Sequence, residues 1–362
     1  MDARYMALAL TLGRRGHGRT WPNPAVGAVI VKDGLVVGRG WTQPGGRPHA
    51  EVEALRRAGP AARGATLYVT LEPCSHCGKS PPCADAVIAA GIGRVLSALE
   101  DPNPEVAGAG HARLRAAGIT VDVGLCAEEA RRDHAGHIRR MRDGRPHVML
   151  KIAASADGKA GAVGRKPVAI TGERTRERVH LLRARSDAIM IGIGTALADD
   201  PILTCRLPGM TEDSPVRVVL DSKLRLPTNS RLVRSAREVP LWVVTAAGAP
   251  SAAKEAVEAG GVTVLSVARA DGQLDLAAVL RLLAERGISR LMVEAGPILA
   301  AALLEADLVD EVALFRSDKV VGPDGIDALE GMPLTALSQS AYLASICNEA
   351  VGEDRCEIFE RR

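Results

Sequence analysis

The segment His49-Ala50-Glu51, taken with Pro73-Cys74 and Pro82-Cys83, decides the fold of the first half of the chain. These stretches supply one imidazole, two thiols and one carboxylate. Such a set suits a zinc site with three protein ligands, which leaves the fourth tetrahedral position to water. Zinc lowers the pKa of that water to about 7, so a nucleophile forms at neutral pH. The sequence therefore predicts a hydrolytic zinc site in which Glu51 moves protons.

The spacing of the cysteines leaves the third ligand open. His-x-Glu followed by Pro-Cys is similar to the pattern of zinc nucleobase deaminases, whose second cysteine usually comes three residues after the first. Cys77 stands at that position, whereas Cys83 follows two prolines and opens an apolar run that we expect to be helical. Helix N-termini stabilise thiolates. We favour His49, Cys74 and Cys83 as ligands, with Cys77 as the competitor.

A closed structural zinc site is the alternative interpretation. Cys77 or His76 would then be the fourth ligand, and no water would reach the metal. Such a site does not require a carboxylate two residues after its histidine, so Glu51 favours catalysis.

Length and composition predict two domains. The chain has 362 residues, of which 47% are hydrophobic, enough for two cores of ordinary size. Asp143-Gly144-Arg145-Pro146 interrupts the pattern of helices and strands, so we expect domains at 1–144 and 147–362. Of the seven cysteines, three lie between positions 74 and 83, a distribution that favours a metal over disulfides in a reducing compartment.

Charge and aromatic content restrict the partners. The net charge is only +3, and the chain has three Trp, three Tyr and two Phe, too few for a platform that stacks single-stranded nucleic acid. No apolar run reaches the ~18 residues of a membrane span. The first residues lack the basic and apolar regions of a signal peptide. We expect a cytoplasmic homo-oligomer that acts on a small molecule, without nucleic-acid or membrane partners.

The first half alternates strand-like and helix-like segments. Val26–Val31 and Leu35–Arg39 flank Asp33-Gly34, a pair typical of a two-residue hairpin. We expect a helix over Ala3–Arg15 with Asp2 as its cap. This half is predicted to be a mixed sheet covered by helices.

The second half alternates more regularly. Thr171 is expected to cap a helix that runs to about Ala184. The segments that read as buried strands are Ala188–Gly192, Val216–Leu220, Leu241–Val244 and Leu291–Val293. Helical segments lie between or after them, which predicts parallel strands with crossover helices.

Two turns in the second half are candidates for nucleotide binding. Gly192-Ile193-Gly194-Thr195 follows a strand but lacks the third glycine of a dinucleotide fingerprint. Glu294-Ala295-Gly296-Pro297 joins a strand to a helix whose first N–H groups would face an anion. Taken alone, each is better explained as an ordinary tight turn than as a binding site. Arg183 and Arg206 are candidates for holding a phosphate.

Taken together, the motifs resemble the bifunctional deaminase-reductase family of riboflavin biosynthesis over nearly the whole chain. In the first half they are Asn23-Pro24-x-Val26-Gly27, His49-Ala50-Glu51, Glu72-Pro73-Cys74-Ser75-His76, Pro81-Pro82-Cys83 and Asp101-Pro102-Asn103-Pro104. In the second half they are Lys151-x-x-x-Ser155-x-Asp157-Gly158, Leu181-Leu182-Arg183, Leu197-Ala198-Asp199-Asp200-Pro201 and Val293-Glu294-Ala295-Gly296-Pro297. The resemblance implies an α/β protein with a cytidine-deaminase-like αβα domain and a dihydrofolate-reductase-like α/β domain.

The resemblance also implies two reactions and their residues. The first domain would use Zn²⁺ to deaminate a diaminopyrimidinone ribosylamine 5′-phosphate, with His49, Cys74 and Cys83 as ligands and Glu51 as the proton carrier. Its implied substrate contacts are Asn23, His76, Lys79, Asp101 and Asn103. The second domain would use NADPH to reduce the ribosyl group to ribityl.

For the reductase, the resemblance implies a cofactor side and a substrate side. The implied cofactor contacts are Ala153, Thr195, Asp199, Ser222, Gly296, Pro297, Ile298 and Leu299. The implied substrate contacts are Lys151, Arg183, Leu203, Arg206 and Glu294.

Two alternative functions share parts of this pattern. A nucleic-acid or tRNA base deaminase with an accessory domain would carry the same zinc motif, although the weak charge and few aromatics count against it. A zinc-stabilised scaffold without catalysis would carry the ligands but have no use for Glu51.

Overall fold

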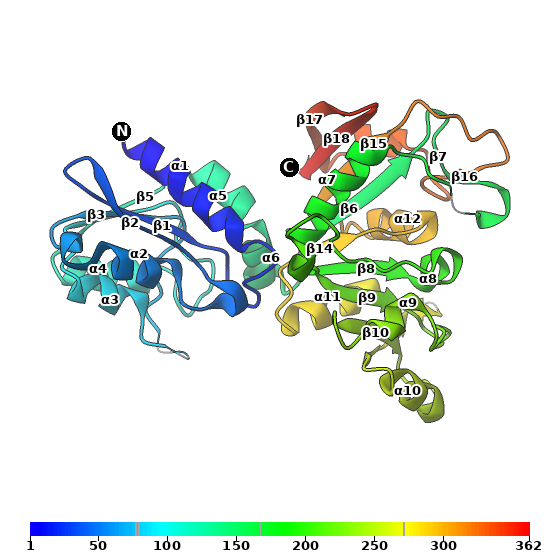
Figure 1. Ribbon diagram of the computed structural model, residues 1–362, viewed down its shortest axis with the longest axis horizontal. Helices are drawn as coiled ribbons and strands as arrows, with labels where there is room; N and C mark the ends of the chain where they lie inside the picture. The colour runs from blue at the N-terminus through cyan, green and yellow to red at the C-terminus, as the bar shows by residue number, and fades with distance from the viewer. Residues whose placement is uncertain (77, 79, 167, 271) are drawn as a thin grey trace. The chain divides into compact units, whose positions relative to one another are not determined.

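The computed structural model describes residues 1–362 except 77, 79, 167 and 271 (Figure 1). The chain forms two compact units, Met1–Arg145 and Pro146–Arg362. Their junction lies in the Asp143–Pro146 segment that interrupts the sequence pattern. Among the described residues, no helix is both long and apolar enough to cross a bilayer.

The first unit is built on a five-stranded mixed sheet of order β2-β1-β3-β4-β5. Its strands are β1 Gly27–Lys32, β2 Leu35–Trp41, β3 Thr66–Val69, β4 Arg94–Ser97 and β5 Thr120–Val123. Its helices are α1 Asp2–Gly13, α2 Ala50–Ala58, α3 Cys83–Ala89, α4 Ala109–Ala116, α5 Ala127–Asp133 and α6 Ala135–Asp143, with 3₁₀ turns at Arg14–Gly16, Pro44–Gly46 and Gly59–Ala62. Helices α2, α3 and α4 pack side by side, and α1 packs with α5 on the opposite face of the sheet (Figure 1). The predicted mixed sheet is confirmed.

Strand direction in this sheet follows from the connections. The hairpin turn Asp33-Gly34 has φ values of 50° and 78°, as a two-residue turn with both central residues at positive φ requires, so the predicted hairpin is confirmed. Strands β3, β4 and β5 are parallel and are joined through helices.

The expected cap of α1 is wrong: Asp2 is the first helical residue, and its carboxylate accepts a hydrogen bond from the Tyr68 hydroxyl at 2.7 Å.

The second unit contains a nine-stranded sheet of order β11-β10-β9-β8-β14-β6-β15-β18-β17. Its strands are β6 His147–Ala154, β8 Ala188–Gly192, β9 Val216–Leu220, β10 Leu241–Ala246, β11 Thr263–Val267, β14 Arg290–Val293, β15 Glu311–Arg316, β17 Leu343–Val351 and β18 Asp354–Arg361. Short strands β7 Lys159–Gly161, β12 Arg269–Ala270, β13 Gln273–Leu274 and β16 Ile326–Asp327 form two small ribbons. The helices are α7 Glu173–Ala184, α8 Ile193–Asp199, α9 Arg231–Arg234, α10 Ser251–Glu258, α11 Leu276–Glu285, α12 Pro297–Glu305 and α13 Thr335–Ser338, with 3₁₀ turns at Val163–Arg165 and Thr211–Asp213.

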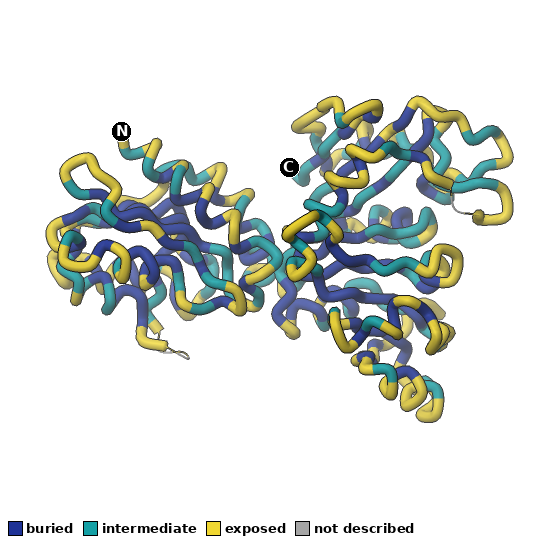
Figure 2. The backbone as a smooth tube through the Cα atoms, viewed as in Figure 1, coloured by how far each residue is buried: buried dark blue, intermediate teal, exposed yellow. Residues whose placement is uncertain are grey.

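Most of this sheet is parallel, as the alternating pattern predicted. Only β17 and β18 add an antiparallel hairpin at one edge. Strands β9 and β10 are buried along their whole length, because helices cover both faces of a parallel sheet (Figure 2). Thr171 is not the cap of α7; Gly172 is, and its N–H donates to Asp354 Oδ2 at 2.8 Å.

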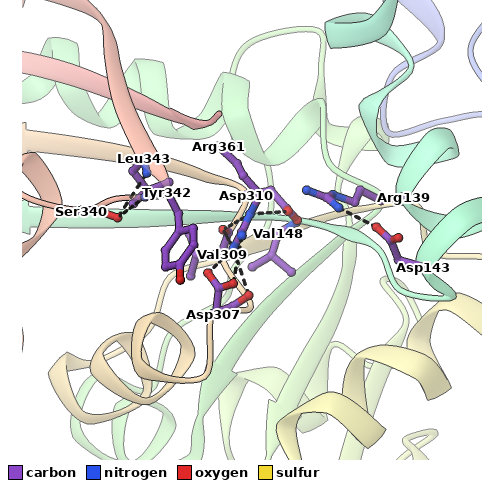
Figure 3. Close-up of polar contacts among 10 residues, drawn as sticks. All are labelled: Arg139, Asp143, Val148, Asp307, Val309, Asp310, Ser340, Tyr342, Leu343 and Arg361. Carbon is purple, nitrogen blue, oxygen red and sulfur yellow. Dashed lines mark hydrogen bonds and ion pairs between the residues drawn. The ribbon is translucent and has the colours of Figure 1, made fainter.

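A polar network ties the last strand to the middle of this sheet (Figure 3). The Arg361 guanidinium donates to Asp307 Oδ1 at 2.6 Å and to the carbonyl of Val309 at 2.8 Å. The neighbouring Asp310 carboxylate accepts from the backbone N–H of Val148 in β6 at 2.9 Å. The turn before β15 is thereby joined to both β18 and β6.

Glu311, the next residue, provides a pH-dependent prediction for stability. Burial raises its pKa to about 7, helped by Glu360 directly opposite on β18 and by Asp310, while Arg290 acts the other way. A carboxyl whose pKa is higher in the folded state weakens folding as pH rises from about 4.5 to about 7. We expect Glu311→Gln to stabilise the protein at pH 8 by about 1 to 3 kcal/mol and to be neutral near pH 4.5.

Urea unfolding at pH 4.5, 6 and 8 measures this effect. The exposed Glu349→Gln on the adjacent hairpin is a matched control, and its effect should not follow this pH profile. A Glu311→Gln effect that is the same at all three pH values would contradict the assignment.

Candidate active sites

The first unit brings His49, Cys74 and Cys83 together. His49 is the N-cap of α2, Cys83 is the first residue of α3 after Pro82, and Cys74 lies in the segment that follows β3. His49 Nδ1 is 3.2 Å from Cys83 Sγ and 3.7 Å from Cys74 Sγ. The three ligand atoms lie within 4.8 Å of one another. Two helix starts and one strand end therefore converge on a single point.

This arrangement fits zinc. Bonds of about 2.0 Å to nitrogen and about 2.3 Å to sulfur, at tetrahedral angles, place N and S about 3.5 Å apart. Cys74 accepts hydrogen bonds from the Cys83 thiol, from His49 and from the Cys83 backbone N–H, and these lower its pKa to about 4. The pKa of Cys83 rises, because its thiol keeps the proton that the two sulfurs share. A divalent cation between the sulfurs replaces that proton, so the donor set suits a metal.

Glu51 is the second residue of α2, two positions after the ligand His49. Its side chain is buried, with only 3% of the residue exposed. Burial raises its pKa to about 7, partly offset by His49. A carboxyl in such surroundings can hold or release a proton near neutral pH, as a general acid–base group must.

The structure describes four of the five other residues expected at this site. Asn23 Nδ2 donates to the carbonyl of Gly46, in the turn that leads into His49, at 2.8 Å. His76 is exposed on the loop after Cys74. Lys79, and the competing ligand Cys77, lie outside the described residues.

Asp101 and Asn103 follow β4, the strand parallel to β3. Asp101 is buried and its carboxylate accepts from the N–H of Asn103 at 2.9 Å. The segment with Cys74 leaves the carboxyl end of β3, and the segment with Asp101 leaves the carboxyl end of β4. Because these neighbouring strands are parallel, the two segments lie at the same edge of the sheet.

In the second unit, Arg183 and Glu294 form a partly buried bidentate pair. Arg183 Nε and Nη2 donate to the two carboxylate oxygens at 2.6 and 3.0 Å, and Nη1 donates to the carbonyl of Thr204 at 3.1 Å. Burial pushes the pKa of Glu294 upward, but Arg183 and Lys151 overcome this and leave the pKa below its usual value. The pair joins α7, the end of β14 and the 203–206 segment.

Cations outnumber carboxylates around this pair. Burial, with a smaller contribution from Arg183, lowers the pKa of Lys151 in β6, and burial followed by Arg183 and Arg206 lowers that of His180. His180 Nδ1 accepts the backbone N–H of Arg206 at 3.3 Å. His180 is therefore neutral, and the positive charge around the carboxylate comes from Arg183, Arg206 and Lys151, which suits a phosphate-bearing ligand.

Leu203 is buried in the same segment. Its φ of +60° lies in the left-handed region, which a branched side chain adopts only when the surroundings impose it. Strained backbone conformations are common at functional sites. Leu203 is followed by Thr204, whose carbonyl oxygen accepts the hydrogen bond from Arg183.

The expected cofactor contacts lie along one edge of the second sheet. Four of them stand at or just after the carboxyl ends of neighbouring parallel strands: Ala153 at β6, Thr195 after β8, Ser222 after β9 and Gly296 after β14. Asp199 ends α8, and burial raises its pKa. Parallel sheets bind nucleotides at this edge.

Two glycines make room for a ligand at this edge. A Cβ on Gly296 would lie 3.1 Å from Thr195 Oγ1, so the turns after β8 and β14 already touch. Gly296 and Pro297 begin α12, which has no side-chain cap, and the first-turn N–H groups that include Ile298 and Leu299 are therefore available to an anion. A Cβ on Gly194 would meet no atom within 4 Å. These features fit the pyrophosphate of a dinucleotide.

Sequence analysis assigned no role to four supporting residues, although one of them, Glu72, stands in a quoted motif. They are Glu72, His137, His180 and Arg217. Arg217 is wholly buried in β9 and donates to the carbonyl of Ile202, next to Leu203, at 3.2 Å. Their partners are distant backbone groups or loop residues, so no local pattern signals them.

Comparison with known families agrees with this geometry. The model for the cytidine and deoxycytidylate deaminase zinc-binding region matches residues 1–99, and the model for the RibD C-terminal domain matches residues 146–348. The chain is thus a bifunctional enzyme with a cytidine-deaminase-like unit and a dihydrofolate-reductase-like unit, and its cofactors are Zn²⁺ and NADPH.

Full-length relatives make the assignment more specific. The riboflavin biosynthesis protein RibD of Escherichia coli strain K12 is 44% identical over 368 residues, covering 98% of both chains. The Acinetobacter baumannii RibD structure has a TM-score of 0.89 at 34% identity, covering 100% of this chain and 99% of that one. The structure of a Thermotoga maritima deaminase/reductase has a TM-score of 0.85 at 34% identity, with the same coverage of both chains. The chain belongs to the RibD family of riboflavin biosynthesis, which favours this function over nucleic-acid base deamination.

The third zinc ligand can be tested by metal content. We expect Cys83→Ser to lose most of about one bound zinc per chain, because serine is a poor replacement for a thiolate. Cys126→Ser, at a half-buried cysteine of the same unit, should keep its zinc. Elemental analysis after dialysis measures both. Full zinc in Cys83→Ser would point to Cys77 instead.

Proposed function

We propose that residues 1–144 deaminate 2,5-diamino-6-ribosylamino-4(3H)-pyrimidinone 5′-phosphate and that residues 147–362 then reduce its ribosyl group to ribityl. The observation that supports this proposal is the presence of two candidate sites in one chain. One is the His49, Cys74 and Cys83 cluster with Glu51 beside it. The other is the Arg183–Glu294 pair, within a sheet whose carboxyl edge fits a dinucleotide.

In the deaminase unit, zinc held by His49, Cys74 and Cys83 would supply Lewis-acid activation of water. Glu51 takes a proton from the attacking water and gives it to the departing amino group, which leaves as ammonia. Its burial keeps bulk water away from the transferred proton. Asn23, Asp101 and Asn103 orient the pyrimidine and ribose, and His76 and Lys79 meet the phosphate.

In the reductase unit, NADPH would supply hydride for C1′ of the ribosyl group. Ala153, Thr195, Asp199, Ser222 and the 296–299 turn hold and orient the cofactor. Lys151, Arg183, Leu203, Arg206 and Glu294 hold the substrate, with the positive groups placed for its phosphate. Support comes from the cationic surroundings of Glu294 and from the bidentate fork of Arg183.

The protein is also proposed to be cytoplasmic and to form a homo-oligomer. Cys126, Cys205, Cys347 and Cys356 are free thiols, which suits a reducing compartment. Strand β17 lies at one edge of the nine-stranded sheet, with Ile346 46% exposed, and such an edge can pair with a second copy. Sedimentation at several concentrations tests self-association.

Glu51→Gln tests deamination. We expect ammonia release to fall by about 10²- to 10⁴-fold, because the amide cannot carry the proton. Zinc content should stay unchanged, because Glu51 is not a ligand. NADPH oxidation should also vanish when the diamino substrate is supplied, and should persist when the deaminated intermediate is supplied.

Glu53→Gln is the matched control. Glu53 is buried on the same helix but pairs with Arg56 and Arg57, so its variant should retain ammonia release. Undiminished ammonia release by Glu51→Gln would contradict Glu51 as the proton carrier, and the absence of ammonia release by the wild type would leave only a zinc-stabilised scaffold.

Arg183→Lys tests the reductase. Lysine keeps the positive charge but cannot form the fork to Glu294, so we expect the KM for the deaminated intermediate to rise about tenfold or more. Deamination should be unaffected. Arg178→Lys, on the same helix but in an exposed pair with Glu349, should leave the KM unchanged. An equal response of the two variants would contradict a specific role for Arg183.

A further inference from the structure

Glu72 is a buried carboxylate beside the zinc-ligand segment, two residues before Cys74. Both of its oxygens accept hydrogen bonds from backbone N–H groups of one distant segment. Oε2 accepts from Asp101 at 3.1 Å and from Gly108 at 2.9 Å. Oε1 accepts from Gly110 at 2.8 Å and from His111 at 3.1 Å.

These contacts make Glu72 the cap of helix α4. Gly108 is the N-cap of α4 and offers no side chain, so the first N–H groups of the helix lack a local acceptor. The Glu72 carboxylate supplies one and meets the positive end of the helix. The approach is close: a Cβ on Gly110 would lie 2.0 Å from the carbonyl oxygen of Pro73, so only glycine fits.

The grouping of Glu72, Glu100 and His111 has the composition of a metal site, but the hydrogen bonds argue against that reading. An ionised carboxylate has about four acceptor positions, and backbone donors already take four. Burial lowers the pKa of His111, so it is neutral and adds no charge to the group. Glu72 is an anion held by amides.

The same segment carries Asp101, whose carboxylate is fixed from a third element. His137 of α6 is hydrogen-bonded through Nε2 to Asp101 Oδ1 at 3.0 Å, and both side chains are about nine-tenths buried. Glu72 thus fixes the Asp101 backbone and His137 fixes its carboxylate.

We propose that Glu72 is a positioning residue for deamination: it locks the 101–111 segment against the Cys74 segment, so that Asp101 and Asn103 meet the substrate at a set distance from the zinc ligands. His137 completes the alignment by orienting Asp101. This inference rests on the proposed deaminase function of the first unit.

Glu72→Gln tests the lock. Whichever way the amide is turned, its NH₂ group faces two backbone N–H donors, and the segment must move. We expect the KM for the diamino substrate to rise about tenfold or more, with kcat changed less than about threefold. Zinc content and reduction of the deaminated intermediate should match the wild type. The amides of Asp101, Gly108, Gly110 and His111 should exchange hydrogen faster.

Glu53→Gln is the control for loss of a buried carboxylate in this unit, and its exchange in 101–111 should match the wild type. Two variants of His137 cover the case in which Glu72→Gln fails to fold. His137→Phe removes the donor to Asp101 and should raise the KM, whereas His137→Gln places an N–H near the position of Nε2 and should restore it.

Three results would overturn the proposal. They are unchanged KM and exchange in Glu72→Gln, loss of zinc in that variant, and equal KM values for His137→Phe and the wild type. Hydrogen exchange needs no substrate. A wild type that releases no ammonia would therefore refute the deaminase function, while faster exchange confined to 101–111 would still support the lock.

Discussion

Parallel strand pairing places the carboxyl ends of neighbouring strands at one edge of each sheet. The pairs concerned are β3 with β4 in the first unit and the run β9, β8, β14 and β6 in the second. A helix follows most of these strands, and each crossover begins with a turn at that edge. Residues far apart in the chain, such as Cys74 and Asp101 or Thr195 and Gly296, are thereby gathered without any direct sequence relation. Both candidate sites depend on this constraint.

Three carboxylates, Glu72 and Glu51 buried and Glu294 partly buried, illustrate how surroundings give one chemical group different tasks. Glu72 is compensated by four backbone N–H groups and acts as a fixed anion. Glu294 is compensated by the Arg183 fork and stays ionised, as its lowered pKa indicates. Glu51 has less compensation, and burial raises its pKa to about 7, which suits a group that exchanges protons.

Sequence reasoning was strongest where chemistry is written in adjacent residues. His49-Ala50-Glu51 and the two Pro-Cys pairs indicated the ligand set, and the structure brings those side chains together. It was weaker for caps: Asp2 and Thr171 have capping side chains, but tertiary partners shifted the helix starts, with Tyr68 binding Asp2 and Asp354 binding Gly172. It quoted Glu72 within a motif but assigned it no role, because its partners are backbone N–H groups, which every residue but proline carries.

The sequence by itself determined the class of fold, the zinc-type donor set and the two-part organisation, because alternating apolar segments and ligand spacing are local properties. Only the tertiary structure decided which buried charges are compensated and how the 101–111 and 203–206 segments are held. Those outcomes depend on hydrogen bonds between distant elements, as between Glu72 and Gly110 or Arg217 and Ile202. Such bonds exist only once parallel strands have brought their connecting segments to a common edge.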